Sequence, residues 1–289
     1  MSTGRTKKTL ALSSALLLSA MSLSACADSA DDVETTTNTD TTTVTSTIET
    51  VANGQSAGEC EGYEYEQAVR WLQQSTEAAA LQMQTYRFAT ERLAELNAAH
   101  EAGGASKPAA IVTDLDETVI DNTALLASEI ASCEDYSDWD RWEDWELGGH
   151  PTLIPGALEF LTAADAAGIS IFYISDRYED NKDATVATLQ ELELPQVDDT
   201  ADNVLLLGEP KLERRESVEA DYEILMLLGD TMHDFDAAYA KDQLPEGARA
   251  QKEQLQGDAE HLGYDWIVLP NPSYGTWSEH PLTTWEQQE

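Results

Sequence analysis

The feature that most constrains the fold is a short apolar run that ends in two acids. Residues 109–113 (Ala-Ala-Ile-Val-Thr) are apolar or β-branched, and Asp114 and Asp116 follow directly. Such a run predicts a buried parallel strand that ends where the acids begin. Side chains two residues apart point the same way along a strand, so both carboxylates should project from its carboxyl end. Open α/β sheets bind their ligands at that edge.

Further apolar runs end in polar groups in the same way. They cover residues 169–174, 204–208, 224–228 and 266–269, and helices are predicted at about 158–167, 182–192 and 213–219. This alternation predicts an α/β fold built on a doubly wound parallel sheet. Crossover connections would bring to one edge the polar groups that follow the runs, namely Ser175, Lys211, Asp230 and Asp234.

Two other stretches are expected to form a small helical subdomain. The first, about 62–99, has apolar residues at three- or four-residue steps and predicts one long helix or two in sequence. The second, about 124–150, carries Trp139, Trp142 and Trp145 three residues apart, so they share roughly one helix face. A buried core and an aromatic wall over an active site both fit this row.

The N-terminus has the pattern of an export signal. A basic start precedes an apolar run around residues 16–18, and Leu-Ser-Ala-Cys follows at 23–26. Residues 1–25 are therefore predicted to be a lipoprotein signal peptide, with Cys26 acylated as the new N-terminus. Residues 26–57 are rich in Thr, Asp and Ser and predict a disordered tether. The folded domain is expected over residues 58–289, outside the cytoplasm and anchored to a membrane in the cell envelope.

The charge of the chain is strongly acidic. It has 16 Lys and Arg residues against 55 Asp and Glu residues, a formal net charge of −39. Such a surface repels polyanions, which argues against nucleic acid as a partner and suits a protein kept soluble in high salt. An anionic substrate then needs local positive charge, which Arg177, Arg214 and Arg215 are predicted to supply.

Two cysteines remain once Cys26 is lipidated. Outside the cytoplasm Cys60 and Cys133 are a possible disulfide, and two separate thiols are the alternative.

The acids and their neighbours suit phosphoryl transfer. A carboxylate such as Asp114, close to Mg²⁺, can attack phosphorus and form an aspartyl-phosphate. Asp116 can protonate the leaving oxygen and then deprotonate water. Ser175 and Lys211 can hold phosphoryl oxygens. Each residue alone has a simpler explanation as a turn or surface residue, and it is their order along the chain that favours a catalytic site.

These residues resemble a known set of motifs. D-L-D-E-T at 114–118, Ser175, Lys211 and G-D-x-x-x-D at 229–234 are similar to the four motifs of the haloacid-dehalogenase-like (HAD-like) phosphohydrolases. Finer details resemble the class C acid phosphatases, the lipoprotein e family of acid phosphatases and 5′-nucleotidases. They are D-L-D-E-T-V-I-D-N at 114–122, W-x-x-W at 142–145, S-D-R at 175–177, K-L-E-R-R at 211–215 and P-N-P-S-Y-G at 270–275.

The resemblance covers about residues 60–280 and implies a Rossmann-type core with a small helical cap. It implies Asp114 as nucleophile and Mg²⁺ ligand, Asp116 as acid/base and ligand through its backbone carbonyl, and Asp230 and Asp234 as further metal ligands. Ser175 and Lys211 are implied to hold the phosphate. Stacking of a nucleotide base makes Trp142, Trp145 and Tyr274 candidates for substrate binding, together with Arg177.

Two positions depart from the family pattern. Asp176 and Thr231 stand where the family commonly has Asn, after the motif Ser and after the metal Asp. An extra carboxylate at Asp176 would weaken anion binding unless Arg177 or the metal offsets its charge.

The sequence thus predicts a lipid-anchored, Mg²⁺-dependent acid phosphatase or 5′-nucleotidase. The alternatives are a non-catalytic lipoprotein that binds a phosphorylated ligand or a metal, and a sugar-phosphate phosphatase or phosphotransferase.

Overall fold

Five parallel strands form the central sheet of the described part of the chain. In the computed structural model that part is residues 64–137 and 139–285. The strands are β1 (Ala109–Thr113), β4 (Ser170–Tyr178), β5 (Val204–Leu207), β6 (Glu223–Gly229) and β7 (Trp266–Val268), in the spatial order β5-β4-β1-β6-β7. Every pairing between neighbours is parallel. The predicted α/β fold with a doubly wound sheet is confirmed.

The central strand is β1, and the chain changes direction there. It adds β4 and β5 on one side and then returns to place β6 and β7 on the other. In the register of the sheet, Ile111 lies between Ile171 and Met226. A ligand site is expected at such a switch point, outside the carboxyl ends of the strands. Asp114 and Asp230 follow those ends directly.

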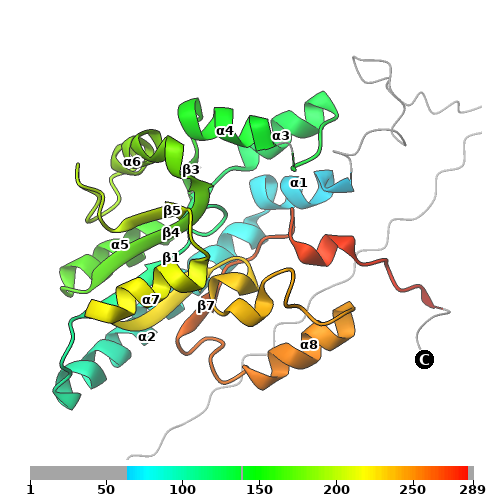
Figure 1. Cartoon of the computed structure of the whole chain (residues 1–289). Helices are drawn as coiled ribbons and strands as arrows, with labels where there is room; N and C mark the ends of the chain where they lie inside the picture. Colours follow the sequence, from blue (N-terminus) through cyan, green and yellow to red (C-terminus); the bar gives the residue numbers. More distant parts are fainter. Residues whose placement is uncertain (1–63, 138, 286–289) are drawn as a thin grey trace, which may run out of the picture. The chain divides into compact units, whose positions relative to one another are not determined.

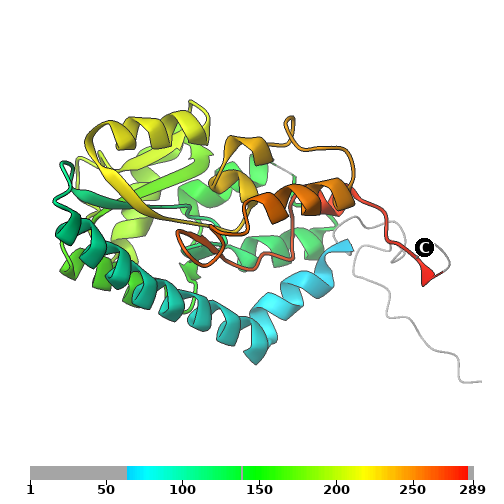
Figure 2. The same cartoon turned by 90° about the horizontal axis from the view of Figure 1, so that it is seen from below.

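Helices cover both faces of the sheet (Figure 1). On one face Ile111 packs in a core with Tyr86, Phe160 and Leu189. These belong to α2 (Thr76–Gly103), α5 (Ala157–Ala166) and α6 (Lys182–Glu191). On the other face Val112 packs against Val218 of α7 (Lys211–Asp221). Figure 2 shows α2 and α7 on opposite sides of the sheet. Because side chains alternate along β1, Ile111 packs in the core on one face of the sheet and Val112 packs in the core on the other.

The two predicted helical stretches each divide into two helices. The first forms α1 (Glu66–Gln74) and α2, separated by Ser75, whose backbone is extended and whose Oγ accepts a hydrogen bond from the Ala78 N–H at 2.9 Å. The second forms α3 (Thr123–Ser132), which ends at left-handed Cys133, and α4 (Trp139–Gly148). Helices α1, α3 and α4 share a separate apolar cluster of Tyr65, Val69, Leu125, Leu126 and Trp142.

Several elements were not predicted from the sequence. They are the antiparallel pair β2 (Ile120–Asp121) and β3 (Thr152–Leu153), α8 (Ala248–Gly257), and 3₁₀ turns at Glu179–Asn181, Met232–Asp234, Ala237–Tyr239 and Thr276–Glu279. They are too short, or too polar in the case of α8, to show a hydrophobic period.

Two predicted boundaries at the edge of the sheet were wrong. Strand β4 does not stop before Ser175 but runs on to Tyr178. Helix α7 begins at Lys211 rather than two residues later. Ser175 therefore lies within β4, in a part whose register with β5 shifts between Ile174 and Tyr178, and Lys211 stands at the first position of a helix.

The predicted signal peptide (1–25), tether (26–57) and Cys26 lie outside the described residues, as does Cys60. Among the helices that the structure describes, none combines the length and the apolarity needed to cross a membrane.

Candidate active site

A tight loop after β1 carries the two acids of the D-x-D motif. Leu115 is fully buried, and its carbonyl accepts hydrogen bonds from the Val119 and Ile120 N–H groups at 2.8 and 2.9 Å. Glu117 adopts a left-handed conformation with φ 56°. Tyr86 of α2 donates its hydroxyl to the Thr118 carbonyl at 2.6 Å. The loop is therefore held from its own backbone and from the packed helix beneath it.

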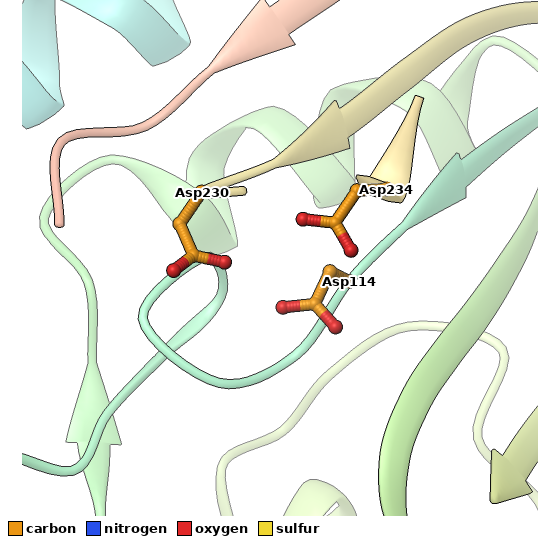
Figure 3. A group of neighbouring side chains, drawn as sticks. All are labelled: Asp114, Asp230 and Asp234. Carbon is orange, nitrogen blue, oxygen red and sulfur yellow. The ribbon is translucent and has the colours of Figure 1, made fainter. Parts of the chain in front are cut away.

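Three carboxylates meet at this loop. Asp114, Asp230 and Asp234 each place an oxygen within 4.8 Å of the others, from the ends of β1 and β6 and from the turn after β6 (Figure 3). The Thr118 hydroxyl lies 3.2 Å from Asp114 Oδ2 and 3.4 Å from Asp230 Oδ1. Asn271 donates its amide to Asp230 Oδ2 at 2.8 Å. Asp116 has no side-chain oxygen in this group of described residues.

Lys211 is the cation of the cluster. Its Nζ lies 2.7 Å from Asp114 Oδ1 and 2.6 Å from Asp234 Oδ1, and all three side chains are buried. Burial lowers the pKa of Lys211, but Asp114, Asp234 and Asp176 outweigh that effect and raise it, so the ammonium stays charged. One positive charge thus faces three carboxylates.

The pKa values of the carboxylates reflect this imbalance. Burial, opposed by Lys211 and reinforced by the neighbouring acids, raises the pKa of Asp114 to about 7. Burial and the charges of Asp234 and Asp114 raise that of Asp230 well above its ordinary value. Burial also acts on Asp234, but Lys211 outweighs it and holds that pKa below its ordinary value. An all-oxygen cluster with uncompensated negative charge suits a hard divalent cation.

Asp116 faces a different partner. Arg177 donates from Nε and Nη2 to its carboxylate at 2.8 to 3.1 Å, and the Ser175 hydroxyl and Asn122 amide add bonds of 3.1 and 2.8 Å. Burial raises the pKa of Asp116, but Arg177 and these donors outweigh it and hold the pKa below its ordinary value. Ser175 is fully buried and directs its hydroxyl to Asp116.

The structure shows how the extra carboxylate at position 176 is balanced. Asp176 pairs with Arg214, whose Nη2 lies 2.5 Å from its Oδ1, and His233 Nε2 is 3.5 Å from its Oδ2. Burial raises the Asp176 pKa, but His233, Lys211 and Arg214 together hold it below its ordinary value. Arg177 is committed to Asp116 instead, so of the two groups considered as offsets for Asp176, Arg177 is not the one that pairs with it.

Fewer of the three predicted arginines supply positive charge to the cleft than expected. Arg214 and Arg215 are both buried, and Arg215 donates to the Asp234 carbonyl at 2.7 Å. Only Arg177 of the three lines the cleft. The other departure, Thr231, donates its hydroxyl to Asp234 Oδ2 at 2.9 Å and so helps to orient that carboxylate.

A cleft of about 400 Å³ opens over these groups. Its lining joins the acids and their cations to a set of aromatic side chains, and it consists of Asp114, Asp116, Tyr136, Trp142, Glu146, Asp176, Arg177, Tyr178, Leu207, Lys211, Asp230, Thr231, His233 and Tyr274. Asp234 and Ser175 stand behind this lining.

The predicted aromatic residues divide between the cleft and its support. Tyr274 stacks on Tyr136 at 5.5 Å and meets Trp142 edge-on at 6.0 Å, and all three line the cleft. Trp145 is not among the lining residues. Its indole N–H donates to Asn122 Oδ1 at 2.8 Å, and Asn122 in turn holds Asp116. Trp145 therefore supports the acid/base candidate from behind.

Sequence reasoning missed five residues of the cleft, namely Tyr136, Glu146, Tyr178, Leu207 and His233. Glu146 lies one turn after Trp142 on α4, a spacing that indicates a shared helix face and could have revealed it. Tyr136 and Tyr178 follow no period that would have marked them. Cys133 is disulfide-bonded, and the chain's other cysteines lie outside the described residues, so the pairing with Cys60 stays a prediction.

Comparisons with known proteins show the family of the chain. The model of the HAD superfamily, subfamily IIIB (acid phosphatase), matches residues 26–277. The solved structure of the class C acid phosphatase from Bacillus anthracis is similar at 30% sequence identity and a TM-score of 0.66, over 74% of this chain and 86% of that one. The tungstate-bound form of the same enzyme gives the same values. The chain therefore belongs to the acid phosphatases of HAD subfamily IIIB, which are phosphomonoesterases.

Proposed function

We propose that the protein is an extracytoplasmic, Mg²⁺-dependent acid phosphatase that hydrolyses nucleoside 5′-monophosphates through an aspartyl-phosphate. The observation that carries this proposal is the composition of one cleft. A carboxylate cluster with Lys211 stands at one part of its lining, and stacked aromatic side chains stand at another. Neither a phosphate site nor an aromatic wall alone would favour a nucleotide.

Asp114 is the proposed nucleophile. Lys211 and Thr118 hold its two oxygens, which fixes the carboxylate, and the charge of Lys211 opposes the burial that raises its pKa. One oxygen attacks phosphorus, the bond from phosphorus to the ester oxygen breaks, and the phosphoryl group passes to Asp114. Water then attacks the same phosphorus, the bond from phosphorus to the Asp114 oxygen breaks, and inorganic phosphate and the free carboxylate are released. Lys211 stabilises the negative phosphoryl oxygens throughout.

Asp116 is the proposed proton shuttle. It donates a proton to the leaving oxygen and later takes one from the attacking water. The hydrogen bonds from Arg177, Ser175 and Asn122 restrict its side chain to one orientation. Because Arg177 favours the ionised carboxylate, proton donation by Asp116 is easier in an acidic medium.

The metal site is assigned to Asp114, Asp230 and Asp234, with Mg²⁺ as the ion. When bound, the ion would neutralise phosphoryl charge and orient the phosphoryl group for in-line transfer. The support in this chain is the donor set, which contains only oxygens, and its excess of negative charge.

Phosphate release from purified protein tests the proposal. We expect turnover of adenosine 5′-monophosphate and p-nitrophenyl phosphate with Mg²⁺, and none in EDTA or after Asp114→Asn. The exposed Asp144 on α4 provides a matched control, and Asp144→Asn should retain wild-type rates. Full activity of the Asp114→Asn variant would show that the nucleophile is assigned wrongly.

We also propose that Cys26 is acylated and anchors the protein to a membrane outside the cytoplasm. The support is the order of basic start, apolar run and Leu-Ser-Ala-Cys at residues 23–26. Labelling of cells with radioactive palmitate should mark the wild-type protein and leave Cys26→Ala unmarked. Equal labelling of both would contradict the anchor.

A further inference from the structure

A buried carboxylate in the cleft has no part in the chemistry described so far. Glu146 of α4 is 4% exposed, yet it lines the cleft. Its Oε2 accepts two hydrogen bonds, from the Tyr178 N–H at 3.1 Å and from the Asn181 amide at 2.9 Å. Among the described residues, none donates a hydrogen bond to its Oε1. Oε1 borders the open space of the cleft, where a bound ligand could supply the donor that it lacks.

The position of Glu146 relates it to the leaving group of the substrate. On one side it stands one helical turn from Trp142, which packs against Tyr274. On the other side it accepts a hydrogen bond from the Tyr178 backbone. The preceding residue, Arg177, donates hydrogen bonds to the Asp116 carboxylate. Glu146 is thus connected both to the proton shuttle and to the aromatic wall.

A nucleotide has its parts in a matching order. The ester oxygen that Asp116 protonates leads to the sugar, and the sugar leads to the base that would stack on the aromatic side chains. The stretch of cleft between these two regions therefore meets the sugar. The groups that a ribose offers there are its 2′- and 3′-hydroxyls, which are hydrogen-bond donors suited to a carboxylate oxygen.

We propose that Glu146 is a specificity-determining residue whose Oε1 accepts a hydrogen bond from a sugar hydroxyl of the leaving group. The inference rests on the proposed function and adds a substrate class to it. The enzyme prefers phosphomonoesters whose leaving group carries hydroxyls in the position of the ribose diol. Oε2 meanwhile holds α4 to the last residue of β4 and to the turn that follows it.

The structure offers a variant that separates these two roles. In Glu146→Gln the two N–H donors at Tyr178 and Asn181 select the amide oxygen for the tether. The NH₂ group then stands in the place of Oε1, so an acceptor becomes a donor while the two hydrogen bonds from Tyr178 and Asn181 remain. Glu143→Gln on the same helix is the matched control, because Glu143 is exposed and loses the same charge.

The experiment compares adenosine 5′-monophosphate with its 2′,3′-dideoxy analogue, which has the same base and phosphate. We expect kcat/KM of the wild-type full-length protein to favour the ribonucleotide by about tenfold or more, the range of a hydrogen bond to a charged group. The preference should shrink severalfold in Glu146→Gln, because the sugar hydroxyl then meets a neutral amide instead of a carboxylate, and it should persist in Glu143→Gln.

Two results would overturn the inference. One is a wild-type protein that hydrolyses both nucleotides equally well. The other is a Glu146→Gln variant in which the kcat/KM values for the two nucleotides fall by the same factor. That result is expected if Glu146 only holds α4 in place. Asn181→Ala, which removes one tether bond and leaves Oε1 in place, should lower both rates and keep the ratio. A protein that hydrolyses no phosphomonoester would instead contradict the proposed function.

Discussion

The carboxylate cluster predicts an unusual dependence of stability on pH in the metal-free protein. Burial and neighbouring acids raise the pKa of Asp114 to about 7, against 3.8 for an unperturbed aspartate. A carboxyl group with a higher pKa in the folded state binds more protons when folded, so its contribution to stability increases as the pH falls. From pH 8 to pH 5 this group alone should stabilise the folded state by roughly 2–3 kcal/mol.

The other carboxyl groups of the site do not reverse this sign. Asp116, Asp176 and Asp234 have pKa values below the ordinary one, so their contribution is present above that value and is lost only at more acidic pH. Asp230 has a raised pKa and acts in the same direction as Asp114. Repulsion among surface acids also relaxes on acidification, so the test needs an internal comparison.

Asp114→Asn supplies that comparison because it removes the titrating group and keeps the side-chain shape. Urea unfolding in EDTA at pH 8 and pH 5 gives the two free energies of unfolding. We expect the difference between them to be smaller in the variant by roughly 2–3 kcal/mol. At pH 8 the metal-free variant should be the more stable protein, since it buries one charge fewer.

Addition of Mg²⁺ at pH 8 completes the test. A ligand at about 100 times its dissociation constant stabilises the folded state by roughly 2.7 kcal/mol, and this gain should appear in the wild type and be much reduced in Asp114→Asn. An equal pH dependence in both proteins, or a wild type that loses stability between pH 8 and pH 5, would refute the description of the cluster as a site of uncompensated charge.

Three further changes test single contacts of the site. In Gly229→Ala the new Cβ would lie 2.4 Å from Asp234 Oδ2, so we expect weaker Mg²⁺ binding in calorimetry and a loss of roughly 1–3 kcal/mol in the free energy of unfolding. Arg177→Met removes the cation that lowers the Asp116 pKa, so the pH–rate profile for an alkyl phosphate should move to higher pH. Asp176→Asn leaves a buried guanidinium without its carboxylate, so KM for phosphate esters should fall severalfold at low salt, with kcat nearly unchanged.

The sheet could be predicted because each strand carries its own signal. The apolar run at 109–113 is buried throughout and the run at 224–228 is mostly buried, as inner parallel strands require, and the structure contains them as β1 and β6. Once the strands were placed, the meeting of Asp114 and Asp230 followed from topology alone. Trp145 shows the limit of this reasoning. Spacing placed it on a face with Trp142, but which side of that face borders a cleft depends on packing between α1, α3 and α4.

The partners of the buried charges at Asp116 and Asp176 were not predicted from the sequence. The reason lies in one strand boundary. Strand β4 continues through Ser175 to Tyr178, with an irregular register to β5 after Ile174, and here residues 175 and 177 are buried while residue 176 is exposed. Ser175 and Arg177 accordingly both bond to Asp116, while Asp176 turns to Arg214 of α7. The predicted strand ended at residue 174, so it gave no alternation for residues 175–177. Arg177 was therefore considered as a counter-charge for its neighbour Asp176. An extra acid at 176 is therefore tolerated because strand geometry delivers it to a separate guanidinium, and the Asp116 carboxylate keeps Arg177 to itself.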